Sequence, residues 1–561
     1  MFDLVIRDAQ IFDGSGAKPM HGDIGVTAGK IAEIGRNLGA ARETLDAHGL
    51  ALAPGIIDGH THYDAQITWD PFVDPSPALG VTTAILGNCG FTIAPCRPAD
   101  RDLTMRHLTH VEGMSLDALR AGIRWEFESF PQYLDMLTRL GVGPNVACFS
   151  GHSSVRTWVM GEEATERTAT DDEIAKMAKL VREAMAAGAI GFASSTAEAH
   201  NGEGGLPMPS RLADDRELRA LVKAMGESGA GVYMLTRGAR TSIPYLEELA
   251  AEIGRPVVIA ALFHSNTNPT AAFTTLSQVN EARARGHQLV AQTSCCPLSM
   301  DFTFKSPYLF ESMKAWKPAM AAHGDAELKK VYRDPAWRAA VKQELEAARG
   351  RLVFNSEWDK LFVVEVAKPE NRSMEGATLA ELAKKANKDP LDFILDFALS
   401  ENLDTAFVAQ LLHNDEKAVG RILADPNTHI SLSDAGAHLT FFCDAGFGLH
   451  LMGHWSREAG VLDLAQAVHR LTGQPAKLFG IQSRGLLRTG YAADLMLFDP
   501  ATVARGPNRR AHDLPSGAAR LTASAIGLQG VWINGTKVAD AQGFCADPKA
   551  RPGEVLRSFA A

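Results

Sequence analysis

Two histidines near the start of the chain stand at a spacing that suits metal binding. They are His60 and His62, in the segment Gly-Ile-Ile-Asp-Gly-His-Thr-His-Tyr-Asp at residues 55–64. Side chains two positions apart project from the same face of a strand, so both imidazoles would lie side by side if the apolar pair before them begins a strand. Neutral imidazole is a common metal ligand. Because isolated histidines are also ordinary surface residues, a metal site requires further ligands from elsewhere in the chain.

Further ligand-type residues follow apolar runs downstream. They are Cys89, His152, His264 and Asp434. Each has a structural interpretation, since a free cysteine is usually a small buried side chain, an aspartate can cap a helix, and a histidine can be hydrogen-bonded in a core. Their shared position after apolar runs favours one site, because separate packing roles would not place them all there. Imidazole, thiolate and carboxylate together are typical of zinc, and thiolate disfavours magnesium or calcium.

The elements that must position these residues are apolar runs that alternate with helical patterns. Strands that alternate with helices predict a parallel sheet, and eight of them predict an α/β fold of the (β/α)8 TIM-like barrel type. In such a barrel the chemistry sits at the C-terminal strand ends, where the ligand-type residues fall. The eight runs are residues 55–62, 81–89, 145–152, 188–195, 231–237, 257–264, 288–295 and 429–435.

Both ends of the chain carry short strand patterns separated by turn residues such as Asn534-Gly535. Neither set is long enough to bury its own core. We therefore expect both ends to form one small β-sandwich, with the barrel inserted between them. The predicted boundaries are 1–54 with 485–545 for the sandwich, 55–484 for the barrel, a helical insertion near 300–350, and a tail at 546–561.

Composition and charge exclude several functional classes. The 561 residues are 46% apolar and carry a net charge of -10 without a basic block, so nucleic acid is not an expected partner. No apolar run approaches the ~20 residues of a membrane span, and the first residues lack the pattern of a signal peptide. Seven cysteines, thinly spread, do not predict a disulfide framework. We expect a cytoplasmic protein with a small-molecule substrate, and the sequence leaves homo-oligomer formation open.

Several segments together resemble a known family. Residues 54–64 (PGIIDGHTHYD) resemble the metal-binding signature of the amidohydrolase superfamily, and residues 490–500 and 530–538 resemble its small sandwich. Within that superfamily, residues 87–95 (GNCGFTIAP) resemble the N-acyl-D-amino-acid deacylases, or D-aminoacylases, as do GHSSVR at 151–156 and the Ser-Asp-Ala triplet at 433–435. The resemblance covers nearly the whole chain, and it implies zinc-dependent hydrolysis of a C–N amide bond, with an N-acyl-D-amino acid or a related N-acyl compound as substrate.

The resemblance also implies a role for each candidate ligand in a centre of one or two zinc ions. Cys89 would be a ligand in the place that a carboxylated lysine or a glutamate holds in relatives, with His264 beside it. His60, His62 and Asp434 would belong to the second metal position, and Asp434 would be the catalytic acid and base.

Four further residues are candidates for contact with the substrate. His152, Arg156 and Arg237 are placed to steady an oxyanion or a substrate carboxylate, and arginine suits bidentate carboxylate binding. His438, just past the last strand, is a candidate for orienting the substrate or binding metal. Both arginines also have a purely structural interpretation.

Three places depart from the family pattern. Thr236 stands where the family has a histidine after the fifth strand, Asn266 stands where it has a lysine, and its His-Pro-Arg segment is not evident at 437–442. A neutral hydroxyl is a poor zinc ligand, so either the metal moves toward the remaining ligands, or His152 or water fills the gap. An amide substrate without the usual α-carboxylate is therefore an alternative.

Three other functions stay open at this point. A serine hydrolase is suggested by residues 151–155, which start like a nucleophile elbow but lack its closing glycine. A metal-dependent hydrolase of a cyclic amide, ester or lactone would share the same fold. A non-catalytic scaffold is conceivable because of Thr236, although retention of all the other expected ligands argues against decay.

Overall fold

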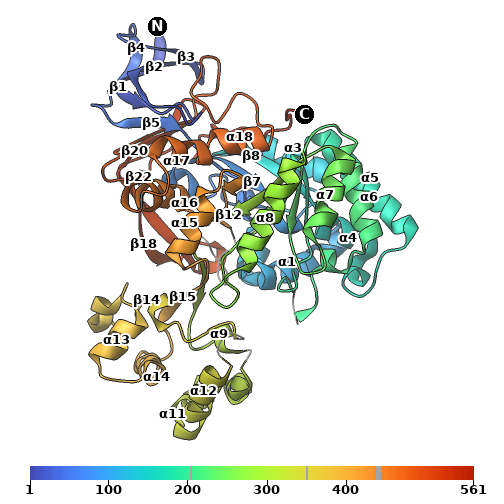
Figure 1. Cartoon of the computed structure of the whole chain (residues 1–561), viewed down its shortest axis with the longest axis vertical. Helices are drawn as coiled ribbons and strands as arrows, with labels where there is room; N and C mark the ends of the chain where they lie inside the picture. Colours follow the sequence, from blue (N-terminus) through green and yellow to red (C-terminus); the bar gives the residue numbers. More distant parts are fainter. Residues whose placement is uncertain (203–204, 312, 349–351, 437–443) are drawn as a thin grey trace.

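A barrel of parallel strands forms the centre of the molecule (Figure 1). The computed structural model describes residues 1–561 except 203–204, 312, 349–351 and 437–443. The barrel strands follow one another in the sheet in chain order, which confirms the predicted fold. They are β6 (Ile56–Asp58), β7 (Val81–Leu86), β8 (Asn145–Gly151), β9 (Gly191–Ser195), β10 (Val232–Thr236), β11 (Val257–Ala260), β12 (Leu289–Thr293) and β16 (Thr428–Ile430).

The barrel closes between its first and last strands. Thr61, just past β6, forms a parallel bridge with Ala435, just past β16. The His62 N–H donates to the Ala435 carbonyl at 2.7 Å, and the Asp434 N–H donates to the His60 carbonyl at 3.1 Å. This closure brings Asp434 beside His62, although 372 positions separate them in the chain.

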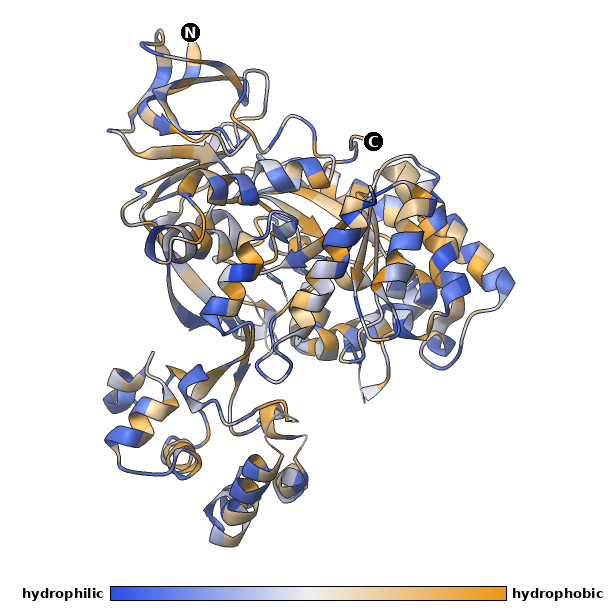
Figure 2. Ribbon diagram, in the orientation of Figure 1, coloured by the Kyte–Doolittle hydropathy of each residue, from blue (hydrophilic) through white to orange (hydrophobic). Residues whose placement is uncertain are grey.

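Amphipathic helices cover the outside of the barrel, with hydrophobic residues toward the strands and hydrophilic residues outward (Figure 2). In α5 (Asp171–Ala187) the Thr170 side chain accepts from the Glu173 N–H while the Glu173 carboxylate accepts from the Thr170 N–H. Gly188 ends the helix with a positive φ of 104°. The helices around the barrel are α4 (His152–Met160), α5 (Asp171–Ala187), α6 (Asp215–Gly226), α7 (Ile243–Ile253), α8 (Ala271–Ala284), α15 (Glu416–Ala424), α17 (Leu464–Leu471) and α18 (Gly473–Leu478).

The connection from β7 to β8 is much longer than a barrel requires, and it carries three helices. They are α1 (Arg101–Val111), α2 (Leu116–Gly122) and α3 (Phe130–Leu140). In Figure 1, α1 lies on the lower side of the barrel, where the chain also leaves for the large insertion. Glu112, the residue after α1, lies 3.1 Å from His62, so this end of the helix reaches the C-terminal strand ends.

Both ends of the chain join in one sheet, as expected for the small sandwich. Its join is the antiparallel pair β5–β17, in which Leu52 lies opposite Leu497. The strands are β1 (Phe2–Ile11), β2 (Met20–Thr27), β3 (Lys30–Gly35), β4 (Ala41–Asp46), β5 (Ala51–Pro54), β17 (Leu495–Phe498), β20 (Leu528–Ile533), β21 (Thr536–Asp540) and β22 (Gly543–Phe544). A separate hairpin consists of β18 (Ala504–Ala511) and β19 (Arg520–Ile526).

The long insertion after β12 forms a lobe with its own aromatic core, at the opposite end of the molecule from the N-terminal strands (Figure 1). Trp316, Tyr332 and Phe407 are buried in that core. The lobe extends beyond the predicted 300–350, because later strands and helices share the same core. Its elements are β13 (Leu298–Phe302), α9 (Tyr308–Glu311), α10 (Lys317–Met320), α11 (Asp325–Arg333), α12 (Pro335–Ala347), β14 (Leu361–Glu365), α13 (Leu379–Lys385), α14 (Pro390–Ser400) and β15 (Ala406–Leu412).

The last segments of the chain complete the structure. Helix α16 (Phe447–His450) continues into a π-helix at Leu451–Glu458, and the C-terminal residues run along the barrel, where Val555 forms a parallel bridge with Val146. None of the helices within the described ranges combines the length and the apolar character that crossing a membrane requires.

Candidate metal centre

Three predicted ligands meet at the C-terminal end of the barrel. Each of His60, His62 and Cys89 offers a ligand atom, and all three atoms lie within 4.8 Å of one another. The Cys89 Sγ is 3.5 Å from the His60 Nε2 and 4.0 Å from the His62 Nε2. All three side chains are buried. Because imidazole and thiolate bind zinc together, this geometry fits a zinc ion.

The backbone around Cys89 is shaped to turn its sulfur into the barrel. Cys89 itself has a φ of 56° within the short 3-10 turn η3 (Asn88–Gly90). Gly90 follows with a φ of 76°, and a Cβ there would lie 2.5 Å from the Ala193 carbonyl oxygen. Only glycine permits this close approach to β9.

Asp434 completes the cluster from the other side of the barrel closure. Its Oδ1 lies 3.0 Å from the His62 Nε2 and 3.6 Å from the His60 Nε2. Burial opposes ionisation of Asp434, but the hydrogen bond and charge of His62 outweigh burial and lower the pKa of Asp434. The carboxylate is therefore ionised at neutral pH and available to accept a proton.

A buried glutamine orients His60. The His60 Nδ1 lies 3.0 Å from the Gln292 Oε1, and the Gln292 Nε2 donates to the Ser431 carbonyl at 2.9 Å. Since an amide oxygen only accepts, His60 must carry its proton on Nδ1, which leaves the Nε2 lone pair facing the cluster. Burial lowers the pKa of His60 to about 4, so this imidazole is neutral at pH 7.

A buried glutamate contacts His62 from the end of α1. The Glu112 Oε1 lies 3.1 Å from the His62 Nδ1, and both side chains are buried. Sequence reasoning missed both Gln292 and Glu112. Gln292 lies within a predicted strand, where the alternation of side chains could have indicated that it faces the inside of the barrel. No spacing in the sequence connects Glu112 to the histidine pair.

Thr236 also faces the cluster. Its Oγ1 lies 3.0 Å from the Cys89 Sγ. Thr236 is the position at which the resembled family has a histidine. Its side chain is directed at the Cys89 sulfur, but it ends in a hydroxyl group.

His264 lies apart from the three clustered ligands. Strand β11 ends at Ala260, and the residues after it lead His264 toward α8, where its ring lies 6.3 Å from the Phe273 ring. Its backbone exchanges hydrogen bonds with His413, and among the described residues its Nδ1 has no hydrogen-bond partner. His264 is not one of the residues of the three-ligand cluster, and a metal-binding role for it stays a prediction.

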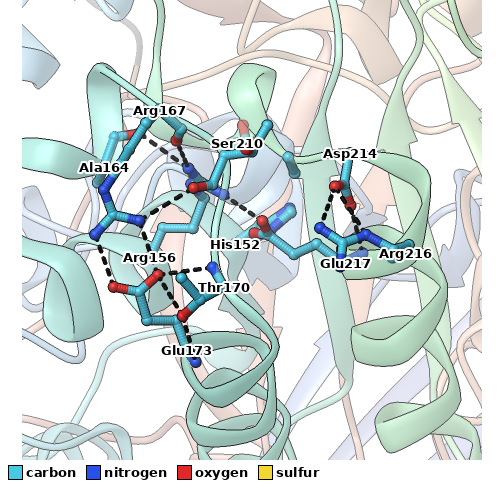
Figure 3. A network of polar contacts seen from close by, with 12 residues as sticks. His152, Arg156, Ala164, Arg167, Thr170, Glu173, Ser210, Asp214, Arg216 and Glu217 are labelled. Atoms are coloured by element: carbon cyan, nitrogen blue, oxygen red, sulfur yellow. Dashed lines mark hydrogen bonds and ion pairs between the residues drawn. The ribbon is translucent and has the colours of Figure 1, made fainter.

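His152 and Arg156 belong to a buried polar network (Figure 3). The two ring nitrogens of His152 contact the Ser194 Oγ at 2.7 Å and the Glu217 Oε1 at 2.8 Å. Arg156, which is 0% exposed, forms an ion pair with Glu217 and donates to the Arg167 carbonyl at 2.7 Å. The network connects α4 to α6 and β9, so the geometry favours a structural role for both residues over the predicted contact with substrate.

Arg237 is half-buried directly after β10, where its guanidinium donates to the Thr275 Oγ1 at 3.2 Å. Within the described part of the chain, Arg237 forms no ion pair with an acidic side chain. His438 lies outside the described residues.

Comparison with known proteins agrees with this geometry. Residues 43–539 match the amidohydrolase family. D-aminoacylase of Alcaligenes xylosoxydans xylosoxydans is 31% identical over 571 residues, which cover 100% of this chain and 98% of that protein. N-acyl-D-aspartate deacylase of the same organism is 29% identical over 561 residues, covering 99% of this chain and 95% of that protein. A solved structure of D-aminoacylase, described for its binuclear metal centre, has a TM-score of 0.66 and 26% identity, with 100% of both chains covered.

Proposed function

Because this chain belongs to the amidohydrolase family, we propose that it hydrolyses the C–N amide bond of an N-acyl-D-amino acid or a related N-acyl compound. The observation that carries this proposal is the convergence of His60, His62 and Cys89 with the Asp434 carboxylate at the barrel closure. A serine nucleophile has no comparable support, because His152, beside Ser153, is held in the buried network with Glu217.

The donor set fits one or two zinc ions. Two imidazole nitrogens, a sulfur and a carboxylate are the ligand types that zinc prefers, and the thiolate excludes a magnesium or calcium preference. Burial raises the pKa of the Cys89 thiol, so a nearby cation is needed to hold it as thiolate. When bound, zinc lowers the pKa of a coordinated water toward ~7 and polarises a carbonyl group.

Asp434 is the residue that we propose as acid and base. Its lowered pKa keeps it ionised, and its position at the rim leaves it 3.0 Å from His62. It would accept the proton of the attacking water and then deliver it to the amide nitrogen, which is a poor leaving group until it is protonated. The bond from the Asp434 N–H to the His60 carbonyl holds the backbone in place during both transfers.

Arg237 is our proposed contact for the substrate carboxylate. It follows Thr236, which faces Cys89, and its guanidinium is half-buried with a carbonyl and a hydroxyl as hydrogen-bond acceptors. Asn266, where the resembled family has a lysine, instead donates to the Glu357 Oε1 at 2.7 Å and so connects to the lobe. A guanidinium suits bidentate binding of a carboxylate.

A substrate screen with a metal measurement tests this function. N-acyl-D-amino acids, their L enantiomers, simple amides, cyclic amides and lactones would be assayed on one preparation whose zinc content is determined. We expect turnover of N-acyl-D-amino acids that falls when a chelator removes zinc and returns on its addition. Turnover that is unaffected by complete removal of zinc would contradict the proposal, and a preference for cyclic amides or lactones would favour the alternative hydrolase.

We also propose the cytoplasm as the location of the protein. The six described cysteines are all free, which fits a reducing compartment. A homo-oligomer remains a proposal to be tested by light scattering.

A further inference from the structure

Among the described residues, the position that faces Cys89 from the end of β10 carries a hydroxyl instead of a nitrogen ligand. Thr236 places a hydroxyl 3.0 Å from the sulfur, and a neutral hydroxyl binds zinc poorly. His152 does not fill this place, because its two ring nitrogens are occupied by Ser194 and Glu217. The His264 ring lies 6.3 Å from the Phe273 ring, on the side of α8. Another imidazole or a water would complete the coordination of an ion on this side of Cys89.

His200 lies at this side of the site. It follows β9, and its ring packs edge-to-face on Phe91, with 5.0 Å between the ring centroids. Phe91 is two positions after Cys89, so His200 packs on the segment that carries the sulfur ligand. The His200 Nδ1 lies 2.7 Å from the Ser195 Oγ.

The strand register places Ser195 next to Thr236. The two residues are paired in the parallel ladder of β9 and β10, and the Thr196 N–H donates to the Thr236 carbonyl at 2.9 Å. Side chains alternate along a strand, and Ser194 already points outward to His152. Ser195 therefore points to the inside of the barrel, as Thr236 does, and its bond holds the His200 ring over the barrel opening.

The backbone of His200 is fixed by its own loop. Its carbonyl accepts from Met208 N–H at 3.1 Å and from the Arg211 guanidinium at 3.2 Å. Next to it, Asn201 bridges Pro207. These contacts hold the His200 backbone against residues 207–211.

The hydrogen bond to Ser195 is compatible with a proton on the His200 Nδ1. The Ser195 Oγ accepts from the Ala197 N–H at 3.2 Å and has capacity to accept from the His200 Nδ1–H as well. The Nε2 of His200 then carries the lone pair, and among the described residues no hydrogen bond occupies it. This is the usual arrangement of a metal-binding histidine, whose other nitrogen is held by an oxygen.

The electrostatic surroundings agree with this placement. Burial, followed by the positive charge of His62, lowers the pKa of His200 to about 4, while Asp434 acts in the opposite direction. The imidazole is therefore neutral at pH 7, and it interacts with the same residues that form the metal cluster.

We propose that His200 is a zinc ligand of this chain, supplying through Nε2 the imidazole that position 236 lacks. This inference rests on the proposed zinc-dependent function. His200 is not one of the three residues whose atoms lie within 4.8 Å of one another, which is expected if it serves a second ion on the Cys89 side.

Zinc binding to the purified full-length protein tests the inference without an activity assay. Wild type, His200→Ala and His323→Ala would be equilibrated with buffered free zinc, and zinc per chain would be measured by mass spectrometry. His323 is an exposed histidine of the lobe and serves as the matched control. We expect His200→Ala to bind one ion fewer, or to need at least ~10-fold more free zinc for that ion, while His323→Ala behaves like wild type.

The visible spectrum of the cobalt-substituted protein separates ligation from a merely structural role. Loss of a nitrogen ligand shifts the cobalt bands, whereas a general loss of stability does not. Because Thr236 already faces the Cys89 sulfur, the double variant Thr236→His, His200→Ala is expected to bind the ion that His200→Ala loses. The double variant also tests the proposal if His200→Ala alone folds poorly. Ser195→Ala is expected to weaken zinc binding less than His200→Ala.

The two proposals fail in different ways. A zinc isotherm and cobalt spectrum of His200→Ala identical to those of wild type would overturn the role of His200 alone, provided that Cys89→Ala loses zinc. Wild-type protein that binds no zinc, and whose turnover survives chelation, would overturn the proposed function itself.

Discussion

The His62 Nδ1 and the Glu112 Oε1 lie 3.1 Å apart, which joins a metal-site histidine to a glutamate at the end of a helix. Glu112 is only 5% exposed. A buried carboxylate is costly unless it is paired, and His62 is its ion-pair partner among the described residues. We infer that this ion pair helps to hold His62 in the orientation that presents Nε2 to the cluster.

Removal of Glu112 is expected to weaken zinc binding. Glu112→Ala should lower zinc affinity about 10–100-fold, while Glu112→Gln, which keeps the shape and polarity of the side chain without its charge, should lower it less. Competition with a chelating dye measures this affinity. Asp102→Asn, an exposed carboxylate on the same helix, is the matched control. Equal zinc affinity of Glu112→Ala and Asp102→Asn would show that Glu112 does not support the metal site.

Replacement of Asp434 should separate metal binding from turnover. Asp434→Asn keeps the shape of the side chain but cannot accept a proton. We expect this variant to retain zinc in part and to lose at least ~100-fold in kcat. Zinc analysis and steady-state kinetics on the same sample check both statements. An unchanged kcat would rule out the acid and base role.

Arg237 should affect only substrates that carry a carboxylate. Arg237→Lys keeps the charge but loses the bidentate geometry, so kcat/KM for an N-acyl-D-amino acid should fall about 10–100-fold. A simple N-acyl amine without the carboxylate serves as the control substrate, and its kcat/KM should not change. A parallel loss on both substrates would assign Arg237 to the structure of the strand end instead.

The buried network in Figure 3 should contribute to stability. Glu217→Ala leaves the Arg156 cation buried without its partner, so we expect about 3–5 kcal/mol less free energy of unfolding. Glu227→Ala removes an exposed ion pair with Arg182 and should cost at most about 1 kcal/mol. Urea titrations of both variants at pH 7 give the comparison. Similar midpoints would mean that the network adds little.

His413 should make the protein less stable in mild acid. Burial lowers its pKa to about 3, against about 6.5 in an unfolded chain, so below pH 6.5 the unfolded state binds a proton that the folded state does not. The contribution of neutral His413 to the free energy of unfolding is complete above pH 6.5 and is lost as the pH falls toward 3. This single group should remove about 2 kcal/mol of unfolding free energy between pH 7 and pH 5.

Substitution of His413 tests that slope. His413→Gln should lower stability at pH 7, because the ring nitrogens contact the His264 N–H and the Ser294 carbonyl. It should also flatten the dependence on pH by about the amount above. Denaturant titrations at several pH values measure the slope, with His323→Gln as the exposed control. An unchanged slope in His413→Gln would contradict the assignment.

Local patterns in the sequence determined much of the fold and the chemistry of the site. The spacing of His60 and His62 placed both on one face, because alternation is a property of a single strand. The alternation of strands and helices predicted the barrel, and the confirmed strand order follows from it. Cys89 was predictable as a ligand because it stands directly after a strand whose end must lie at the barrel opening.

Only the tertiary structure decided which residues surround that centre. Glu112 comes from a helix inserted between β7 and β8, and His200 from a loop after β9, so their positions depend on long-range packing. His264 was expected in the cluster, but β11 ends at Ala260, and alternation no longer sets side-chain direction four positions beyond a strand. His152 and Arg156 follow a strand as well, yet the partner that buries them, Glu217, lies on α6. Contacts between segments distant in sequence depend on how whole elements pack, and short-range periodicity does not encode that packing.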